Sequence, residues 1–326
     1  MPVSLCDVAA IVAWRYPAEG ARLLTVSNDL RTHAELASYA RRTRARKSGE
    51  TRLSFVMRKT RTPVKRLRAL MAAPLRLGID ERNRNGATAL IACANAGSAR
   101  AVRALLRAGA DWRLATTRGE TAMARAAYRG RAKVITELVA GGADVHYGGV
   151  RDGGSSRPPP LLTALYGSNP RGDAAALYLR RDAAALELVR LGADVNVVHT
   201  FDPNDGFGAV INTPLHLACF QRDVPSGIVI GELVRRGADV NARDGDGYTV
   251  IARVVIRAKF SEHMDEEGTM HPTHGAMYED MMRILLSAPG ADVMQANHGE
   301  TAVELAETLA EDGLAAMMRA HSSYRG

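Results

Sequence analysis

The chain has 326 residues, of which 46% are hydrophobic, and its formal net charge at pH 7 is +8. This length can bury one sizeable core or a long stack of small ones. Aromatic residues make up only 5% while alanine is abundant, and small side chains let helices approach closely, so the composition favours an all-α protein over a β-sandwich or a β-barrel.

The sequence argues against an exported or membrane-spanning protein. No apolar run approaches the roughly 20 residues that a membrane span requires. The N-terminus is short and apolar, but it places Asp7 early and lacks the positively charged start of a secretory signal. Cys6, Cys93 and Cys219 show no pairing rhythm. We therefore expect an intracellular protein, cytoplasmic or nuclear, that is not secreted.

Residues 1–40 do not follow the period found later in the chain, and two interpretations stay open. The spacing of Leu5 and Val8 predicts one helix and GARLLTVSNDLRTHAELA (20–37) predicts a second, which together would form a helical cap. Alternatively, the opening Pro and Leu, the Asp and the LLTVSNDLRTHA run (23–34) resemble an F-box, although the second Pro of that family is missing. The F-box resemblance implies docking to the adaptor subunit of a cullin-type ubiquitin ligase.

Residues 41–61 form a basic segment whose charge extends to residue 68. Positions 40–68 hold twelve Lys or Arg and one acid, so they carry +11 and the remainder of the chain carries −3. A solvated helix face, a nuclear import signal, or a site for nucleic acid, acidic lipid or acidic protein would each account for this charge. Nucleic acid is not favoured, because Phe55 is the single aromatic residue there. The candidate basic patch comprises Arg41, Arg42, Arg44, Arg46 and Lys47.

A Gly-Ala-Asp turn recurs five times, starting at residues 109, 142, 192, 237 and 290. Asp111 and Asp144 are 33 residues apart, and the longer intervals indicate the same period with insertions. A helical apolar run precedes the turn, so we expect glycines such as Gly109 and Gly192 to end helices in the left-handed conformation. The Asp and Asn that follow, as in GADVN at residues 192–196 and 237–241, suit a turn, because their side chains can bond nearby backbone.

A second recurrent element is a Thr at a fixed distance after a Gly, followed by a short helical run. Its fullest form is NTPLHLAC (212–219). Thr213 is expected to cap the helix, and Pro214 to occupy its first position, where no hydrogen bond is lost. Leu215 is expected to face inward, and His216 to brace the turn by hydrogen bonds.

These motifs resemble the ankyrin-repeat family over roughly residues 62–320. The resemblance implies L-shaped repeats of two antiparallel helices and a projecting hairpin, stacked as an all-α solenoid. Five clear repeats are expected near residues 83–115, 116–148, 157–198, 210–243 and 244–295. Partial repeats are expected at 64–80 and 299–320, the latter as a C-terminal cap, followed by a tail at 321–326.

Four insertions interrupt the period. Residues 146–160 should form an exposed loop, 168–182 should lengthen one repeat, 197–211 should enlarge a hairpin, and 259–280 should separate two helices. The last insertion contains a cluster of His and acidic residues at 263–274, but their spacing matches no specific metal site. We expect no metal and no cofactor.

The repeats predict a non-enzymatic scaffold, acting as a monomer, that binds partner proteins through a concave surface of hairpin tips and first helices. No phosphate-loop or nucleophile motif is present in the sequence. The candidate contacts are residues that the scaffold leaves free: Trp112, Arg113, Thr117, Arg118, His146, Tyr147, Arg243 and Asp244. The alternatives are a ubiquitin-ligase substrate adaptor and a nuclear or nucleic-acid-associated protein. An F-box-like start followed by ankyrin repeats resembles proteins of large DNA viruses.

Overall fold

The computed structural model describes residues 78–150, 156–166, 174–200, 211–220, 226–261 and 273–324. The region 1–40, the basic segment at 41–61 with its candidate patch, and most of the partial repeat at 64–80 lie outside the described residues. Most of the His-rich cluster at 263–274 lies outside them too. The chain divides into two compact units, Met1–Arg157 and Pro158–Gly326.

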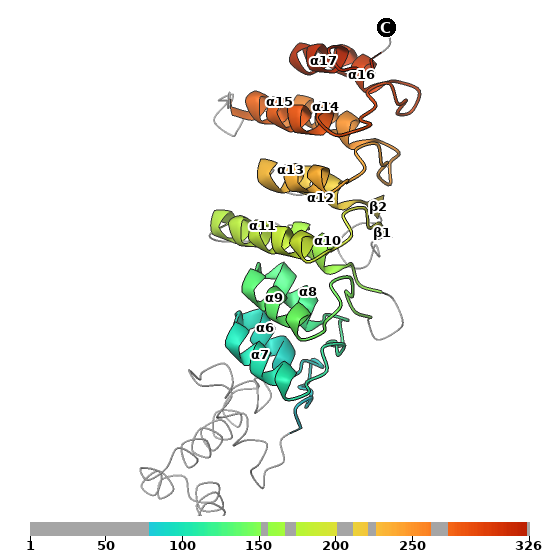
Figure 1. Ribbon diagram of the computed structural model, residues 1–326. Helices are drawn as coiled ribbons and strands as arrows, with labels where there is room; N and C mark the ends of the chain where they lie inside the picture. The colour runs from blue at the N-terminus through green and yellow to red at the C-terminus, as the bar shows by residue number, and fades with distance from the viewer. Residues whose placement is uncertain are drawn as a thin grey trace, which may run out of the picture. The chain divides into compact units, whose positions relative to one another are not determined.

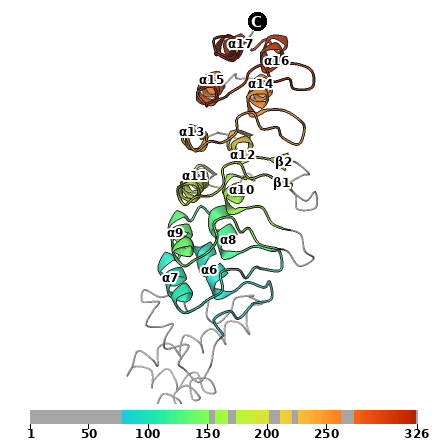
Figure 2. The same ribbon diagram turned by 45° about the vertical axis from the view of Figure 1, so that its right-hand side comes forward.

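The described part of the first unit consists of two helix pairs. α6 (Ala89–Ala96) packs on α7 (Ala99–Arg107), and α8 (Ala122–Tyr128) packs on α9 (Ala132–Ala140). The pairs are stacked, because α6 also contacts α8 and α7 also contacts α9. The first helices therefore form one layer and the second helices another, as the two views show (Figures 1 and 2).

The second unit stacks its helix pairs in the same way. In each pair the first helix packs on the second, and each layer continues from one pair to the next. The helices are α10 (Pro160–Leu165), α11 (Ala174–Arg190), α12 (Pro214–Phe220), α13 (Gly227–Arg235), α14 (Val250–Ser261), α15 (Thr273–Leu286), α16 (Ala302–Thr308) and α17 (Asp312–Arg319). A short ladder pairs β1 (His199–Thr200) with β2 (Ile211–Asn212) in antiparallel register. The predicted solenoid of helix pairs is confirmed.

Threonine begins several of the first helices. The side chains of Thr88, Thr121 and Thr301 each accept a hydrogen bond from the backbone N–H three residues on. In α12, Thr213 Oγ1 accepts from the N–H of His216 at 3.4 Å, and the helix begins at Pro214. Such a cap satisfies a backbone donor that has no partner inside the helix, which explains why Thr recurs with the period.

The recurrent Gly-Ala-Asp turn has the left-handed backbone that the sequence predicts. Its five glycines have φ between +80° and +93°. A Cβ on any of them would meet no atom within 4 Å, so the positive φ, and not a lack of space, favours glycine. One carboxylate oxygen of the following Asp accepts the N–H two residues later, at 2.8 to 2.9 Å, in all five turns: Asp111, Asp144, Asp194, Asp239 and Asp292.

Small side chains fill the contacts between the helices. In the first unit Ala94, Ala126 and Ala127 are fully buried, as are the larger Leu105 and Leu138. Alanine lets neighbouring helices approach at the packing density of a protein interior, so the stack needs few aromatic residues. No helix in the described ranges is long and apolar enough to cross a membrane.

The insertions at 168–182 and 259–280 contribute residues to helices. α11 has 17 residues, α14 has 12 and α15 has 14, whereas the helices of the first unit have 7 to 9. The insertion at 259–280, expected to separate two helices, thus also supplies the end of α14 and the start of α15. The segment at 299–320, expected to be a partial repeat, contains a complete helix pair, α16 and α17.

Candidate partner-binding surface

The segments that link one helix pair to the next project beside the layer of first helices in each unit (Figure 1). We call these segments fingers. In the first unit the fingers are residues 78–88, 108–121 and 141–150. In the second unit they include residues 236–249 and 287–301. All eight predicted contact residues are on these segments.

One polar residue closes the tip of a finger. Thr116 donates its N–H to the carbonyl four residues on at 3.1 Å, and its Oγ1 accepts the N–H of that same residue at 3.1 Å. Asn83 makes the corresponding contacts at 3.0 and 2.9 Å, and Asp244 makes them at 2.9 and 3.0 Å. The tip therefore requires an accepting side chain, whereas the charge of that side chain differs between fingers.

The fingers at 78–88 and 108–121 are joined by backbone contacts. Thr117 donates both its N–H and its hydroxyl to the carbonyl oxygen of Asn85, at 3.0 and 3.3 Å. Thr117 and Arg118 are exposed, and within the described ranges no acidic side chain or carbonyl pairs with the guanidinium of Arg118. Two of the candidate contact residues are thus neighbours at one junction between fingers.

An aromatic and cationic cluster lies between two fingers of the first unit. The rings of Trp112 and Tyr147 meet edge to face, with centroids 5.8 Å apart and planes at 80°. Arg113 lies over the Trp112 ring, 4.5 Å from its centroid. Such contacts stabilise the junction by about 1 kcal/mol each. His146 is exposed next to Tyr147, and its backbone N–H donates to Asp144. Four candidate residues are brought together here.

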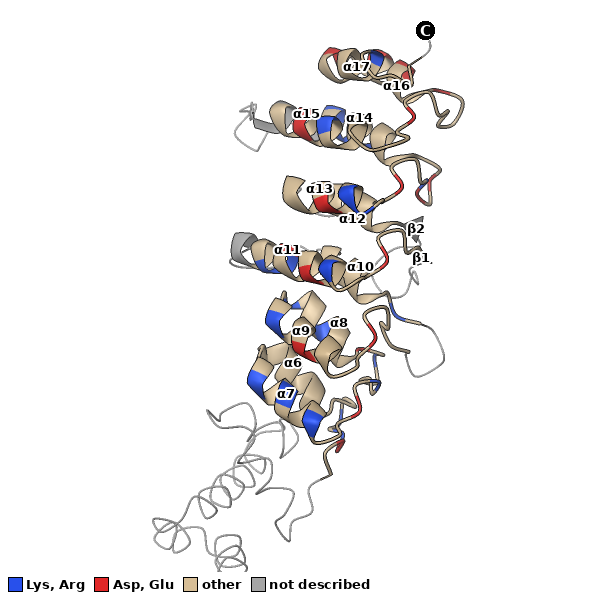
Figure 3. Cartoon of the chain, viewed as in Figure 1, with Lys and Arg blue, Asp and Glu red and all other residues tan. Residues whose placement is uncertain are grey.

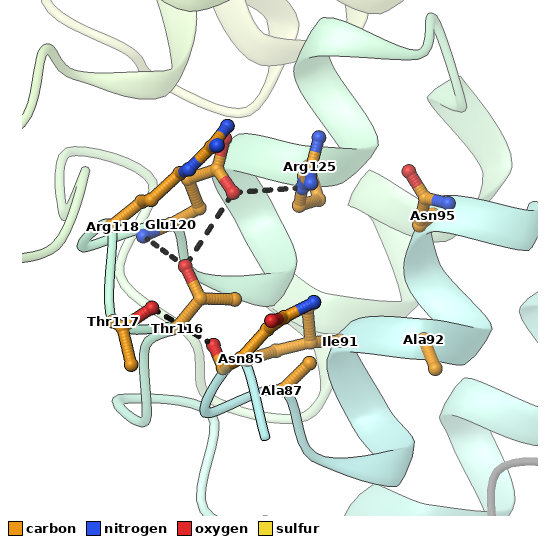
Figure 4. Close-up of a pocket in the computed structure, with 10 residues that line it drawn as sticks. All are labelled: Asn85, Ala87, Ile91, Ala92, Asn95, Thr116, Thr117, Arg118, Glu120 and Arg125. Carbon is orange, nitrogen blue, oxygen red and sulfur yellow. Dashed lines mark hydrogen bonds and ion pairs between the residues drawn. The ribbon is translucent and has the colours of Figure 1, made fainter. Parts of the chain in front are cut away.

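A groove of about 360 Å³ runs between the fingers and the first helices α6 and α8 (Figure 4). Its lining combines small apolar side chains with hydroxyl, amide and charged groups. The lining residues are Asn85, Ala87, Ile91, Ala92, Asn95, Thr116, Thr117, Arg118, Glu120 and Arg125. Figure 4 shows that the polar side chains come from both walls of the groove.

Two arginines form contacts with polar residues that line this groove. Arg125 of α8 pairs with Glu120 of the finger at 3.1 Å, and both side chains are partly exposed, at 30% and 19%. Arg129 Nε donates to the amide oxygen of Asn95 at 3.2 Å. Because water reaches the Glu120–Arg125 pair, the pair contributes at most about 1 kcal/mol and a bound group can compete for it.

The candidates of the second unit are occupied within the chain. Arg243 is exposed, but its guanidinium donates to the carbonyl oxygens of Gly247 at 2.6 Å and Ala296 at 2.5 Å. Asp244 is buried, and its carboxylate accepts two backbone N–H groups and pairs with Arg253. Asp244 is therefore a buried turn residue, and we leave it out of the partner-binding surface.

His216 is enclosed in its repeat. Its Nδ1 lies 2.8 Å from Thr213 Oγ1, and only 1% of the residue is exposed. Burial lowers the pKa of His216 to about 4, with the carboxylate of Asp244 acting in the opposite direction. The ring is thus neutral at pH 7. Leu215 is fully buried, so the residues of the motif at 213–216 contribute to the structure of the repeat.

The two units differ in charge. Residues 1–157 carry a net charge of +17 and residues 158–326 carry −9. The described stretch 78–150 alone carries +5, with arginines on its fingers and on both helix layers (Figure 3). The basicity is therefore not confined to residues 40–68, because the first unit continues it into the repeats.

Several lining residues of the groove escaped the sequence analysis. Glu120 and Arg125 are recognisable only from their spacing to the capping Thr121, one residue before and four residues after. Asn85 and Asn95 do not belong to either of the recurrent motifs. Among the described residues no group of three or more His, Cys, Asp or Glu side chains is placed to hold a metal ion.

The helix pairs, capped first helices and linked fingers have counterparts among known proteins. Family models for ankyrin repeats match residues 62–147, as three copies, and residues 212–245, as one. The ankyrin repeat domain of Bcl-3, a member of the IkappaB protein family, is 20% identical with a TM-score of 0.59, covering 83% of this chain and 99% of that domain. The human ASB11 ankyrin repeat domain is 17% identical with a TM-score of 0.51, covering 81% and 98%. No curated protein matches in sequence. The chain contains ankyrin repeats at residues 62–147 and 212–245 and has the fold of an ankyrin-repeat solenoid.

Proposed function

We propose that the chain is a non-enzymatic scaffold that binds a partner protein along the finger side of its first unit. Ankyrin repeats are protein–protein interaction modules, and stacked repeats present extended surfaces for binding. The proposal goes further in choosing the groove at residues 85–125 and the adjoining Trp112, Arg113 and Tyr147 cluster as the surface. Aromatic and arginine side chains of this kind are frequent anchors in protein interfaces.

The observation that carries the proposal is the groove itself. It has an apolar floor at Ile91 and Ala92, and its rim offers hydroxyl, amide and guanidinium groups. A partner can bury apolar surface on such a floor while its polar groups find hydrogen bonds at the rim, as in protein interfaces generally. The described candidates of the second unit, by contrast, are held by contacts within the chain.

A groove-filling substitution tests the proposal. Ala92 lines the groove, whereas Ala96 is exposed at the far end of the same helix and is not part of the lining. Ala92→Tyr should fill the groove, and Ala96→Tyr adds the same side chain outside it, with the same helix-propensity cost of about 0.5 kcal/mol.

The readout is affinity purification of the tagged full chain followed by mass spectrometry. At least one protein captured by both the wild type and Ala96→Tyr should be lost with Ala92→Tyr, while circular dichroism shows all three folded. Capture of the same proteins by all three would mean that the groove is not the binding surface.

The +11 segment at 40–68 supports a second candidate function in the nucleus. A cluster of Lys and Arg is typical of import signals and of surfaces that bind nucleic acid. Changing the five residues of the basic patch at 41–47 to Gln should move a tagged chain from nucleus to cytoplasm. An unchanged distribution would leave only the scaffold function.

A further inference from the structure

Three exposed arginines on the fingers of the first unit have no partner among the described residues. Arg82 and Arg84 are exposed on the finger 78–88, and Arg118 is exposed on the finger 108–121. In the described ranges none of these three guanidinium groups forms a hydrogen bond or an ion pair. An unpaired guanidinium on a surface offers five N–H donors in a planar fork that fits a carboxylate.

The contact between the fingers brings two of these arginines to one place. Thr117 N donates to Asn85 O at 3.0 Å, and Arg84 and Arg118 are each one residue away from that hydrogen bond. Arg118 also lines the groove (Figure 4), and Arg84 stands one residue from the same contact between the fingers.

The rest of the groove suits a main chain. Its lining includes the apolar Ala87, Ile91 and Ala92 and the side-chain amides of Asn85 and Asn95, of which Asn95 accepts from Arg129 through its oxygen. Amides both donate and accept, so they match the alternating N–H and C=O groups of an extended peptide. The groove thus offers backbone contacts along its length and charge contacts at the finger junction.

We propose that this surface binds an acidic, extended segment of the partner protein, with its carboxylates at Arg84 and Arg118 and its main chain in the groove. The inference rests on the proposed function and adds the chemistry of the partner. The fingers 78–88 and 108–121 each carry two arginines and two acids, so the preference for carboxylates comes from the exposed Arg84 and Arg118 and not from net charge.

An acidic peptide fits this surface better than a nucleic acid does. Glu81, Asp111 and Glu120 lie among the arginines and would repel a continuous row of phosphates, whereas a peptide can space its carboxylates around them. The rings of Trp112 and Tyr147 pack against each other and form no series of stacking platforms.

The test measures the binding of a fluorescent peptide to the full chain by anisotropy. The probe alternates Glu and Ser, and the reference probe has Gln in place of Glu. Arg84→Gln combined with Arg118→Gln removes the two charges. Arg100→Gln combined with Arg107→Gln is the matched control, because both residues are exposed on α7, neither lines the groove, and the change in net charge is the same.

The wild type should bind the Glu probe more tightly than the Gln probe. The variant with Arg84→Gln and Arg118→Gln should bind the Glu probe at least about tenfold more weakly than the wild type does. The affinity of the control variant should fall by less than about twofold. Equal losses in the two variants, or no loss in either, would overturn the inference, because binding would then come from overall charge or from residues 40–68. If Arg84→Gln combined with Arg118→Gln loses more affinity for an oligonucleotide probe than for the Glu probe, the inference is overturned in favour of nucleic acid.

The inference and the proposed function can fail separately. If Ala92→Tyr abolishes partner capture while the Glu probe binds no better than the Gln probe, the groove binds a partner but the partner is not acidic. If the Glu probe behaves as expected while Ala92→Tyr retains every partner, the arginines bind acidic peptides and the scaffold function of the groove is wrong.

Discussion

The same hairpin occurs in both units with its charges arranged differently. In the first unit the tip residue is the neutral Thr116, and Arg125 on the following helix pairs with the partly exposed Glu120 at 3.1 Å. In the second unit the tip residue is Asp244, whose side chain is 4% exposed, and the corresponding Arg253 pairs with it. Arg125 and Arg253 both stand four residues after the capping Thr.

The position of the paired carboxylate decides whether the arginine on the first helix is enclosed within the repeat or can contact a bound group. Arg253 also pairs with Asp246 and lies over the Tyr248 ring, 4.7 Å from its centroid, so three groups enclose it. Arg125 has a single, solvated carboxylate at the rim of the groove. The same type of finger can thus be stabilised by a buried ion pair in one unit and present solvated polar groups in the other.

The largest expected effect comes from the buried tip residue of the second unit. Asp244→Ala should lower the free energy of unfolding of that unit by about 4 kcal/mol, because two backbone N–H groups and Arg253 lose their acceptor. Glu120→Ala in the first unit should cost at most about 1 kcal/mol, because its ion pair is solvated.

Two buried cysteines report on the units separately. Cys93 is in α6 and Cys219 is in α12; both are buried, and burial raises the pKa of the Cys219 thiol. In a Cys6→Ser background, thiol labelling at rising urea should modify Cys219 earlier in Asp244→Ala and leave Cys93 unchanged. A joint shift of both thiols would show that the units unfold together, and the comparison between them would fail.

Acid should weaken the second unit through His216. Burial lowers the pKa of His216 from 6.5 to about 4, so between these values the unfolded chain binds the proton and the folded chain does not. The stabilisation is complete above pH 6.5 and is lost as the pH falls toward 4, by about 3 kcal/mol in total. The helices α6 and α8 carry Ile91 and Ala124 at the corresponding position and lack this response.

Hydrogen exchange at pH 7 and pH 4.5, with mass spectrometry of peptides from α8 and α12, measures the difference. The protection of α12 should fall more than that of α8 in the wild type. His216→Asn cannot titrate in this range, so its α12 should lose no more protection than its α8. An equal fall in α12 for wild type and variant would assign the acid response to other groups.

A smaller effect is expected at the loop inside the last helix pair. Gly130, between α8 and α9, has φ +65°, and the corresponding Ala310, between α16 and α17, has φ +60°. Ala310→Gly should raise the free energy of unfolding by about 1 kcal/mol, because glycine adopts this conformation without the strain that a Cβ imposes. Gly130→Ala should destabilise the first unit by a similar amount. Urea midpoints measure both, and a destabilised Ala310→Gly would contradict the argument.

The smallest expected effect compares the Glu120–Arg125 ion pair with the Asp246–Arg253 ion pair. Glu120→Gln frees Arg125 at the rim of the groove and should tighten binding of the Glu probe by about threefold. Asp246→Asn, which removes one carboxylate from Arg253 in the second unit, serves as the control and should leave that affinity unchanged. Weaker binding by Glu120→Gln would place the acidic segment elsewhere.

The sequence alone predicted the parts of the fold that depend on neighbouring residues. The left-handed glycines, the Asp turns and the Thr caps involve contacts across two to four positions, so the motif itself determines them. Among the predicted contact residues, Thr117 and Arg118 line the groove, although Thr117 also bonds the backbone of the neighbouring finger. Trp112 and Tyr147 follow the turns in the sequence, but nothing in the spacing predicted that their rings meet.

The contacts between repeats required the tertiary structure. The Asn at the end of each GADVN motif was expected to serve its own turn, yet Asn196 donates to Gly237 O at 2.9 Å and accepts from Asp239 N at 2.8 Å. Asn241 does the same with Gly290 O and Asp292 N. These links span more than forty positions in the chain, and insertions change the interval, so no fixed spacing reveals them.

Local chemistry thus determined the repeat, and stacking determined which charges remain available. Arg118 and Arg243 are both exposed finger arginines, but Arg243 donates to Gly247 O of its own finger and to Ala296 O of the adjacent finger, whereas no group in the described ranges binds Arg118. A guanidinium reaches across the distance between neighbouring fingers, so its partner comes from the next repeat. The sequence of one repeat specifies its own turn and cap, but the availability of its side chains depends on what the following repeat places beside them.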